Sequence, residues 1–327
     1  MPNQETSDRS WRRFFRIGIG TLLVLVSILC LWFGLVVNPV LQQRQVVEFV
    51  KNSGGTVHFE HEAYRWPLPH PEFSSDLTFD ESKEVPGPSW LKYLIGEDLF
   101  RKPVMIDLAE KEAGQVNNLR ALVKLDDVLW LNLAFNEVTD EGLAPIGEMN
   151  QLRVLCLDRN RLTDQGLVHL ANLQQLELLD LSMNSRLDGS CLKHVGQLCS
   201  LKDLDLQLLP RLDGDALEHL SGHGSLQELM IGQTPLRDEH LRHLSQIPNL
   251  WQLGLDRTNI TDKGVAYIAD NFRLKHLYLE GPKITGECLK SLVRMPTLEY
   301  LSLRNTNVTD EEIEEFNKVL PKCFVSN

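Results

Sequence analysis

Two groups of histidine and carboxylate residues are the first candidates for chemistry in this sequence. His58, Glu60, His61 and Glu62 crowd one short stretch, and imidazole and carboxylate groups are common zinc ligands. On a β-strand, however, three of them would share one face at intervals of about 7 Å, which is wide for a single ion. We therefore expect a solvated strand face and no metal site.

Four further histidines recur at steps of 24 or 25 residues. They are His169, His194, His219 and His243. If each lies on a short helix of a repeated unit, neighbouring helices are about 8–10 Å apart, too far for a shared metal. Copying of the unit explains this column, with a pH-sensing stripe as the alternative.

Catalytic motifs are missing from the sequence: it contains no GxSxG, HExxH, P-loop or GxGxxG pattern. Spacing alone leaves open a nucleophilic triad assembled from distant segments, so a hydrolase is the least favoured class. We predict that the chain is not an enzyme and uses no cofactor.

A repeated unit must position these residues. One copy, residues 152–170, reads LRVLCLDRNRLTDQGLVHL. Leu-x-Leu alternation predicts a short strand with one buried face, and Thr-Asp before a Leu-x-x-Leu stripe predicts a short helix capped by the hydroxyl or carboxylate. Such a unit cannot bury its apolar face alone, so the copies must stack into a curved solenoid. The strand leucine recurs eight times, as Leu131, Leu155, Leu179, Leu204, Leu229, Leu253, Leu277 and Leu301.

This pattern resembles the leucine-rich-repeat superfamily, whose units begin LxxLxLxx(N/T/C)xL. The Thr-Asp-x-Gly-Leu variant is similar to membrane-anchored bacterial repeat proteins and to eukaryotic F-box substrate receptors. The resemblance implies an α/β solenoid with parallel strands on the concave side and short helices on the convex side. It also implies that Asn136, Asn160 and Asn184 bond to the backbone of neighbouring turns, a ladder from which Leu209 and Pro282 depart.

An uncharged apolar segment precedes the repeats. Residues 17–37 would form a helix of about 31 Å at about 1.5 Å per residue, which matches the hydrocarbon core of a bilayer. A cleaved signal peptide is the alternative, but its apolar region would be only about 7–15 residues long. We divide the chain into a cytoplasmic tail (1–16), a transmembrane helix (17–37), a linker and N-terminal capping module (38–124), eight leucine-rich repeats (125–320) and a C-terminal end (321–327).

Basic residues predict the orientation of this helix. Four arginines precede it, and one arginine and one lysine follow within twenty residues. An excess of positive charge stays on the cytoplasmic side, so we predict a single-pass membrane protein with a cytoplasmic N-terminus and extracytoplasmic repeats. The residues counted are Arg9, Arg12, Arg13 and Arg16 before the helix, and Arg44 and Lys51 after it.

The capping module shows local patterns of its own. We expect a helix at 41–50 ended by Gly54-Gly55, a strand at 56–60, a proline-rich loop, a helix at 90–95 and a strand at 104–108. This order is similar to the lead-in of the membrane-anchored bacterial group. An F-box-like helical bundle is not evident.

Charge and cysteine content limit the function classes. The net charge of −12 and pI near 5.3 make nucleic acid a poor partner. The six cysteines include no CxxC pair, so we expect no disulfide scaffold, with a single Cys191–Cys199 bridge as the alternative.

The strand positions that flank the buried leucines point to the concave side. They hold seven carboxylates and one arginine, with aromatic residues at both ends. We predict a groove for an unknown basic or polar polypeptide, with Trp130, Tyr278 and Tyr300 as anchors, and an ordinary solvated acidic face as the alternative. The candidate residues are Trp130, Asp158, Asp180, Asp203, Asp205, Glu228, Asp256, Tyr278, Glu280 and Tyr300.

The predicted function is therefore that of a membrane-tethered, extracytoplasmic module for protein–protein interaction. A structural component of the cell envelope and an F-box-like substrate-recognition adaptor are the alternatives.

Overall fold

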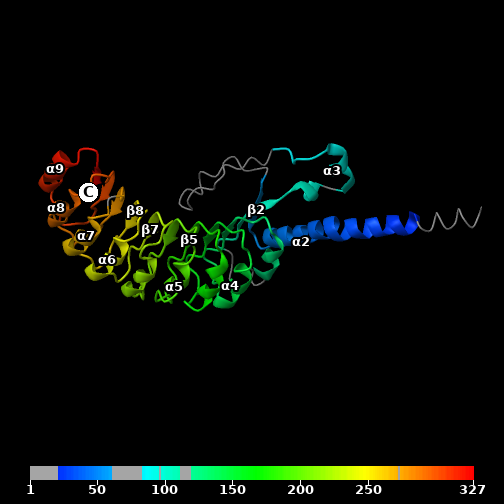
Figure 1. The fold of residues 1–327 in the computed structure, drawn as a ribbon, viewed down its shortest axis with the longest axis horizontal. Coiled ribbons are helices and arrows are strands. Elements are labelled where there is room, and N and C mark those ends of the chain that lie inside the picture. The colour runs from blue at the N-terminus through cyan, green and yellow to red at the C-terminus, as the bar shows by residue number, and fades with distance from the viewer. Residues whose placement is uncertain (1–20, 61–82, 96, 111–118, 272) are drawn as a thin grey trace, which may run out of the picture.

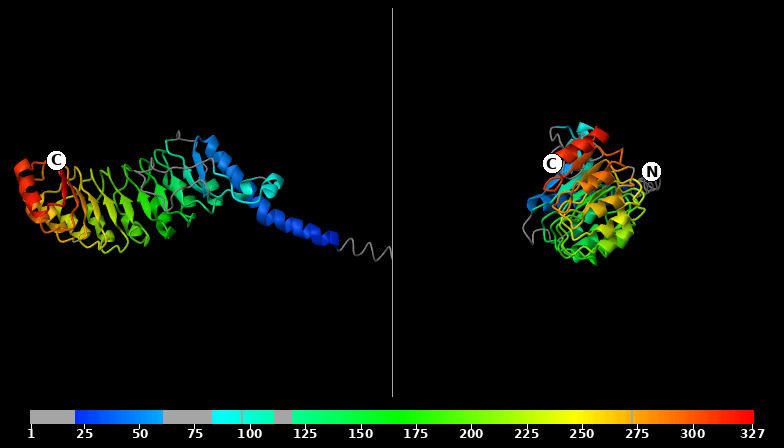
Figure 2. Two further views of the ribbon diagram at one scale, coloured as in Figure 1. Left: turned by 90° about the horizontal axis from the view of Figure 1, so that it is seen from above. Right: turned by 90° about the vertical axis from the view of Figure 1, so that its left-hand side faces the viewer.

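The computed structural model describes residues 21–60, 83–95, 97–110, 119–271 and 273–327. They form a curved solenoid with a long helix projecting from its N-terminal end (Figures 1 and 2). The predicted cytoplasmic tail, the first residues of the predicted transmembrane helix, and His61 and Glu62 lie outside the described residues.

One sheet of eleven strands runs along the solenoid in sequence order. The first pair is antiparallel and every later pair is parallel. Each of the eight predicted strand leucines lies at the centre of its strand and is 0% exposed, so the predicted register is confirmed. The strands are β1 (Thr56–Phe59), β2 (Pro103–Asp107), β3 (Trp130–Asn132), β4 (Val154–Cys156), β5 (Leu178–Asp180), β6 (Asp203–Asp205), β7 (Glu228–Met230), β8 (Gln252–Gly254), β9 (His276–Tyr278), β10 (Tyr300–Ser302) and β11 (Phe324–Ser326).

Short helices line the convex side, opposite the strands (Figure 1). Several are 3-10 turns, labelled η, because a repeat of 24 or 25 residues leaves room for only one or two turns of helix. Their leucines and those of the strands form one continuous core. The elements are η5 (Leu119–Lys124), α4 (Asp140–Ile146), η6 (Gly166–Asn172), α5 (Leu192–Val195), η7 (Gly214–Leu220), η8 (Asp238–His240), α6 (Leu241–Leu244), α7 (Asp262–Ile268), α8 (Glu287–Leu292) and α9 (Asp310–Val319).

The sheet extends beyond the eight predicted repeats at both ends. In β2, Ile106 pairs with Leu131, so the first coil of the solenoid lies inside the segment assigned to the cap. In β11, Val325 pairs with Leu301. Both end strands replace the repeat leucine by another aliphatic residue, and this hid them from the search for leucine periodicity.

A single helix, Thr21–Asn52, replaces the two helices that the sequence predicts at 17–37 and 41–50. It contains a π-helical stretch, η1 (Phe33–Val37), and continues as α2 (Asn38–Asn52). Proline lacks an amide hydrogen and crowds the preceding turn, so a wider turn before Pro39 lets the helix continue. By length and composition this helix could cross a membrane.

The N-terminal end of the solenoid is covered by α2 and β1, and two short helices, α3 (Ser89–Ile95) and η4 (Glu97–Phe100), precede β2. Val46 and Val50 of α2 are buried in the main core. The predicted Gly-Gly stop is confirmed: α2 ends before Gly54, and a Cβ on Gly55 would lie 2.7 Å from the carbonyl oxygen of Asp107. Only glycine lets the chain turn this close to β2.

The predicted asparagine ladder is present over three repeats. Asn160 Nδ2 donates to the carbonyls of Leu133 and Leu157, each at 2.9 Å, and thereby joins two coils. Asn136 and Asn184 make equivalent bonds. Later repeats do not continue the ladder in this form. The hydroxyls of Thr234, Thr258 and Thr306 each donate to a carbonyl three residues back in their own repeat.

The Thr-Asp pairs act partly as predicted. The hydroxyls of Thr261 and Thr309 cap their own helices. The aspartate, however, reaches the following repeat: the carboxylate of Asp262 accepts from both the amide (2.9 Å) and the hydroxyl (2.7 Å) of Thr285. The sequence predicted a cap within one helix, whereas this carboxylate joins two repeats.

The third residue after each of the strands β2 to β10 has a positive φ angle. In most repeats it is not glycine, for example Met183 with φ 58° and Leu208 with φ 57°. Such conformations are costly for residues with a side chain. They recur because the chain turns sharply from the sheet towards the convex side at the same position of each coil.

Candidate binding face

The register of the sheet defines the concave face as three columns, made by the first and third residues of each strand and the residue two positions later. The first column holds Met105, Trp130, Val154, Leu178, Asp203, Glu228, Gln252, His276, Tyr300 and Phe324. The second holds Asp107, Asn132, Cys156, Asp180, Asp205, Met230, Gly254, Tyr278, Ser302 and Ser326. The third contains Asp158, Asp256, Glu280 and Arg304.

The N-terminal third of this face is an apolar patch. It consists of Met105, Trp130, Val154, Cys156 and Leu178. The predicted anchor Trp130 lies on this face, but its side chain is only 2% exposed. Its neighbours in the column, Met105 and Val154, are apolar and buried with it. Trp130, Val154, Cys156 and Leu178 flank the predicted strand leucines, whereas Met105 lies in β2, outside the eight predicted repeats.

Five carboxylates form the acidic centre of the face. They are Asp158, Asp180, Asp203, Asp205 and Glu228. Asp203 is only 7% exposed, whereas the other four are partly exposed. Asp180 and Asp205 also have a structural role: each Oδ1 accepts from the amide two residues on, at 2.9 and 2.8 Å, where the strand ends. Local turn geometry therefore explains part of the acidic pattern.

The acidic centre is electrostatically strained. Burial, and then the nearby carboxylate of Asp180, raises the pKa of Asp158 to about 6. The same two causes raise the pKa of Asp205 to about 7. Like charges on strands about 4.8 Å apart disfavour ionisation. A cation placed over these carboxylates would favour their charged form.

An aromatic ladder occupies the C-terminal third of the face. It consists of Trp251, His276, Tyr278, Tyr300 and Phe324. Four pairs of rings have centroids between 5.2 and 5.9 Å apart, so the rings form one connected strip. The pairs are Trp251–His276, His276–Tyr300, Tyr278–Tyr300 and Tyr300–Phe324. Phe324 is 65% exposed, and the predicted anchors Tyr278 and Tyr300 are partly exposed. Trp251 and Phe324 were missed from sequence, because one precedes its strand and the other lies in the unpredicted β11.

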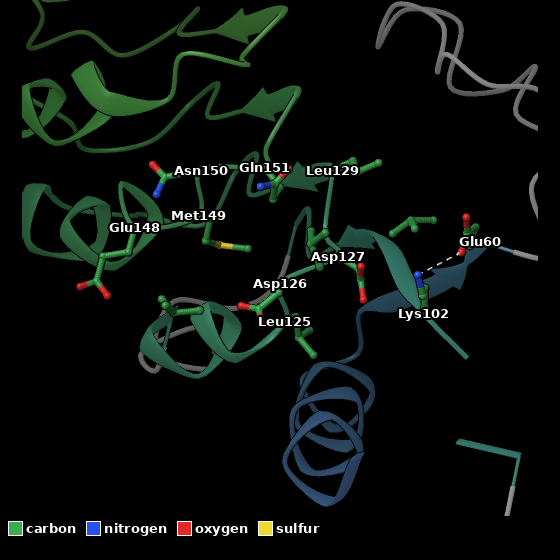
Figure 3. Close-up of a pocket in the computed structure, with 13 residues that line it drawn as sticks. Glu60, Lys102, Leu125, Asp126, Asp127, Leu129, Glu148, Met149, Asn150 and Gln151 are labelled. Carbon is green, nitrogen blue, oxygen red and sulfur yellow. Dashed lines mark ion pairs between the residues drawn. The ribbon is translucent and has the colours of Figure 1, made fainter. Parts of the chain in front are cut away.

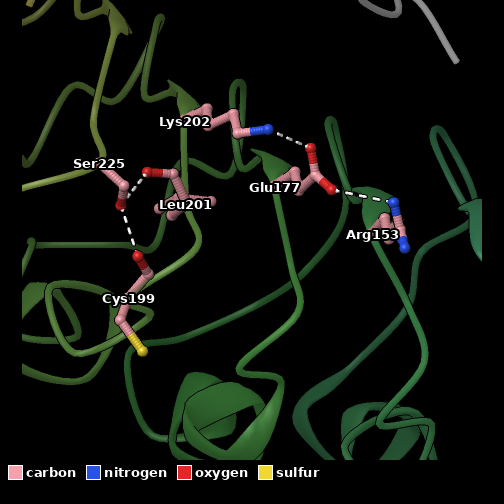
Figure 4. A network of polar contacts seen from close by, with 6 residues as sticks. All are labelled: Arg153, Glu177, Cys199, Leu201, Lys202 and Ser225. Atoms are coloured by element: carbon pink, nitrogen blue, oxygen red, sulfur yellow. Dashed lines mark hydrogen bonds and ion pairs between the residues drawn. The ribbon is translucent and has the colours of Figure 1, made fainter. Parts of the chain in front are cut away.

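Salt bridges line one edge of the concave face, at the residue before each strand. Glu177 forms salt bridges with residues of the repeats on either side (Figure 4). Its Oε1 lies 3.3 Å from Arg153 Nη1, and its Oε2 lies 2.6 Å from Lys202 Nζ. Further along, Lys275 Nζ lies 2.8 Å from Glu299 Oε1. These cations are matched by glutamates of the same edge.

Two hollows adjoin the face. One, of about 660 Å³, lies beside Trp251 and is lined by Arg273, Lys275 and Glu299 among others. The other, of about 470 Å³, lies at the junction of the cap and the first repeats (Figure 3). There Lys102 Nζ is 4.0 Å from Glu60 Oε2. Glu60, a candidate zinc ligand by sequence, is thus paired with a lysine.

Metal and redox chemistry find no support in the described part of the chain. No group of three histidine, cysteine or acidic side chains there is placed to hold a metal ion. The histidine column lies on the convex helices, where His169 and His219 are exposed. All six cysteines are free thiols, and Cys191 is buried whereas Cys199 is exposed, so the alternative of a bridge between them is not realised.

One family model and two solved structures are similar to parts of this chain. A family model described as Leucine Rich repeat matches residues 131–147. No curated protein matches the sequence. Internalin C2 from Listeria monocytogenes shares 20% identity over 70% of this chain and 81% of that chain, with a TM-score of 0.48. A plant peptide hormone receptor, RGFR1, solved in complex with RGF2, shares 23% identity over 69% of this chain and 36% of that chain, with a TM-score of 0.43. Neither likeness bears on function. The repeat sequence and the parallel stacked strands of this chain resemble those of leucine-rich-repeat proteins.

Proposed function

We propose that this chain is a membrane-tethered, extracytoplasmic protein-binding module whose concave face takes a basic polypeptide. One observation carries the proposal: the three concave columns hold eight carboxylates and a single arginine, Arg304. Opposite charge across an interface steers association and selects partners. The raised pKa values of Asp158 and Asp205 support it, since a cationic partner placed over these carboxylates would favour their charged form.

The tether is supported by the helix Thr21–Asn52. It is long and apolar enough to cross a bilayer, and its most apolar window is not buried against the rest of the chain. The excess of arginine before residue 17 favours a cytoplasmic N-terminus. Because α2 continues this helix into the core of the cap, the solenoid would be held close to the membrane surface.

Protease accessibility tests the tether and its orientation. In spheroplasts of an expressing bacterium, protease added outside should digest the repeats while an epitope in residues 1–16 stays protected. Protection of the repeats would contradict the orientation. Release of the intact chain by washing at high salt would contradict the tether.

Cationic probes test the binding face. Full-length protein in detergent micelles should bind a fluorescent octa-lysine peptide, with an association rate that falls as salt rises. The double variant Asp158→Asn, Glu228→Gln removes two charges without changing shape and should slow association by about tenfold. The matched control Glu287→Gln, on an exposed convex position, should leave the rate unchanged.

The structure changes the choice of variant. Reversing Asp203 and Asp205 to lysine is the obvious test from sequence alone. However, Asp203 is buried, and Asp205 accepts two hydrogen bonds from Gln207. Their reversal would disturb the strand end as well as the charge. If the probe does not bind, or binds independently of salt, the structural-component alternative replaces the proposal.

A further inference from the structure

The C-terminal end of the concave face combines aromatic rings with carboxylates. The rings of Tyr278 and Tyr300 lie 5.4 Å apart with an angle of 45° between their planes. Glu280 follows Tyr278 by two residues, and its Oε1 lies 3.4 Å from the hydroxyl of Ser302 on the next strand. Asp256 lies one strand earlier, where its Oδ1 accepts from the amide of Glu280 at 3.2 Å. Two rings and two acidic side chains thus lie on neighbouring repeats, in or just after β8, β9 and β10.

We propose that this corner, formed by Tyr278, Tyr300 and Glu280, docks arginine side chains of an extended segment of the partner protein. The inference rests on the proposed function and names the side chain that the partner presents. A guanidinium group is planar, so it stacks on a ring while its edge donates two hydrogen bonds to a carboxylate. A lysine ammonium is a strongly hydrated point charge and makes the stacked, forked contact poorly.

The same geometry occurs within this chain. The guanidinium of Arg159 lies 4.8 Å above the ring of Phe135, and that of Arg101 lies 5.4 Å above the ring of Phe59. Both pairs join residues of different coils or strands. Guanidinium–ring stacking is therefore compatible with the surface curvature of this solenoid.

The other end of the aromatic ladder carries the opposite charge. The hollow beside Trp251 is lined by Arg273 and Lys275, with Glu299 as their acidic neighbour. Lys275 already pairs with Glu299 at 2.8 Å. An incoming guanidinium would meet two cations there, so we place docking at the Tyr278 end, where the one concave arginine, Arg304, donates its Nε–H to Ser326 Oγ at 3.3 Å. Trp251 is thus a natural control: an aromatic residue of the same ladder outside the acidic corner.

Paired peptides test the inference. Full-length protein in detergent micelles is titrated with fluorescent octa-arginine and octa-lysine peptides, which have equal length and charge. We expect octa-arginine to bind about three- to tenfold more tightly, as one or two stacked contacts would give. The double variant Tyr278→Leu, Tyr300→Leu should abolish this preference while both peptides still bind. Trp251→Leu should preserve it.

A conservative variant guards against misfolding. Tyr278→Phe, Tyr300→Phe keeps the rings and should keep the preference for arginine, whereas the leucine variant loses it. Equal binding of the two peptides by the unmodified protein would overturn the inference and leave the proposed function standing. A preference that persists in the leucine variant would also overturn it. Failure of both peptides to bind would contradict the proposed function itself.

Discussion

The carboxylate of Asp140 holds Thr163 of the following repeat through two hydrogen bonds. Its Oδ1 accepts from the Thr163 amide at 2.8 Å, and its Oδ2 accepts from the Thr163 hydroxyl at 2.6 Å. The same pair of bonds recurs twice later in the solenoid. Gly166 lies beneath this contact, because a Cβ added there would stand 2.4 Å from Asp140 Oδ1. The Thr-Asp-x-Gly signature therefore describes an interlock between two repeats.

Gly166→Ala should reveal this interlock. The new methyl group would displace the Asp140 carboxylate, and we expect unfolding to become easier by about 1–3 kcal/mol. In an Asp140→Ala background the same substitution should cost clearly less, because the clashing oxygen is gone. Gly224→Ala is the control, since its Cβ would meet nothing within 4 Å. Chemical denaturation of the four variants measures the coupling, and additive effects would refute the interlock.

Leu204→Ala tests the register of the central repeats. Leu204 is 0% exposed in the continuous core, so its truncation should cost about 2–5 kcal/mol through lost burial and a residual cavity. Val168→Ala, at a side chain that is 46% exposed on the convex side, should cost less than about 0.5 kcal/mol. Similar values for the two variants would show that Leu204 does not face the core.

Repetition is what made the fold predictable from sequence. Leu131 and its seven equivalents repeat one spacing, and the strands follow that spacing in register. The burial of Trp130 was not predictable in the same way. Whether a concave-facing side chain is covered depends on its lateral neighbours, and the single-repeat pattern does not contain them. The contact from Asp140 to Thr163 was missed for the same reason, because these residues are 23 positions apart.

Left-handed positions offer a stabilising substitution. Met183 has φ 58° and is 36% exposed, so it lies outside the core and only partial burial of its side chain offsets the backbone cost. Asparagine tolerates this conformation better. Met183→Asn should therefore raise the free energy of unfolding by about 0.5–1 kcal/mol. The natural Asn305 has φ 59° at the equivalent place, and Asn305→Met should have the opposite effect.

Thiol labelling should follow burial. Cys199 is exposed, whereas Cys156 and Cys191 are buried, and burial raises the pKa of both buried thiols. Thiolate is the reactive form, so we expect Cys199 to react with a maleimide in the native protein and the other two only after unfolding. Mass spectrometry of labelled peptides measures this. Rapid native labelling of Cys191 would contradict its placement in the core.

Asp205 should make the stability of the protein depend on pH. Burial and the carboxylate of Asp180 raise its pKa from 3.8 to about 7, so between these values the folded state binds more protons than the unfolded state. The contribution of Asp205 to stability therefore falls as pH rises through this window. Asp205→Asn removes the titration but retains the Oδ1 acceptor used by the Gln207 amide.

The expected readout is a difference between two pH profiles. Below about pH 4 the carboxyl is protonated in both states and the variant should resemble the unmodified protein. Towards about pH 8 the variant should become more stable by up to a few kcal/mol, because it carries no buried charge. Comparing the two proteins at each pH cancels the histidines, whose own titration gives an opposing slope. Thermal unfolding in detergent measures the difference, and a constant gap between the profiles would show that Asp205 ionises normally in the folded state.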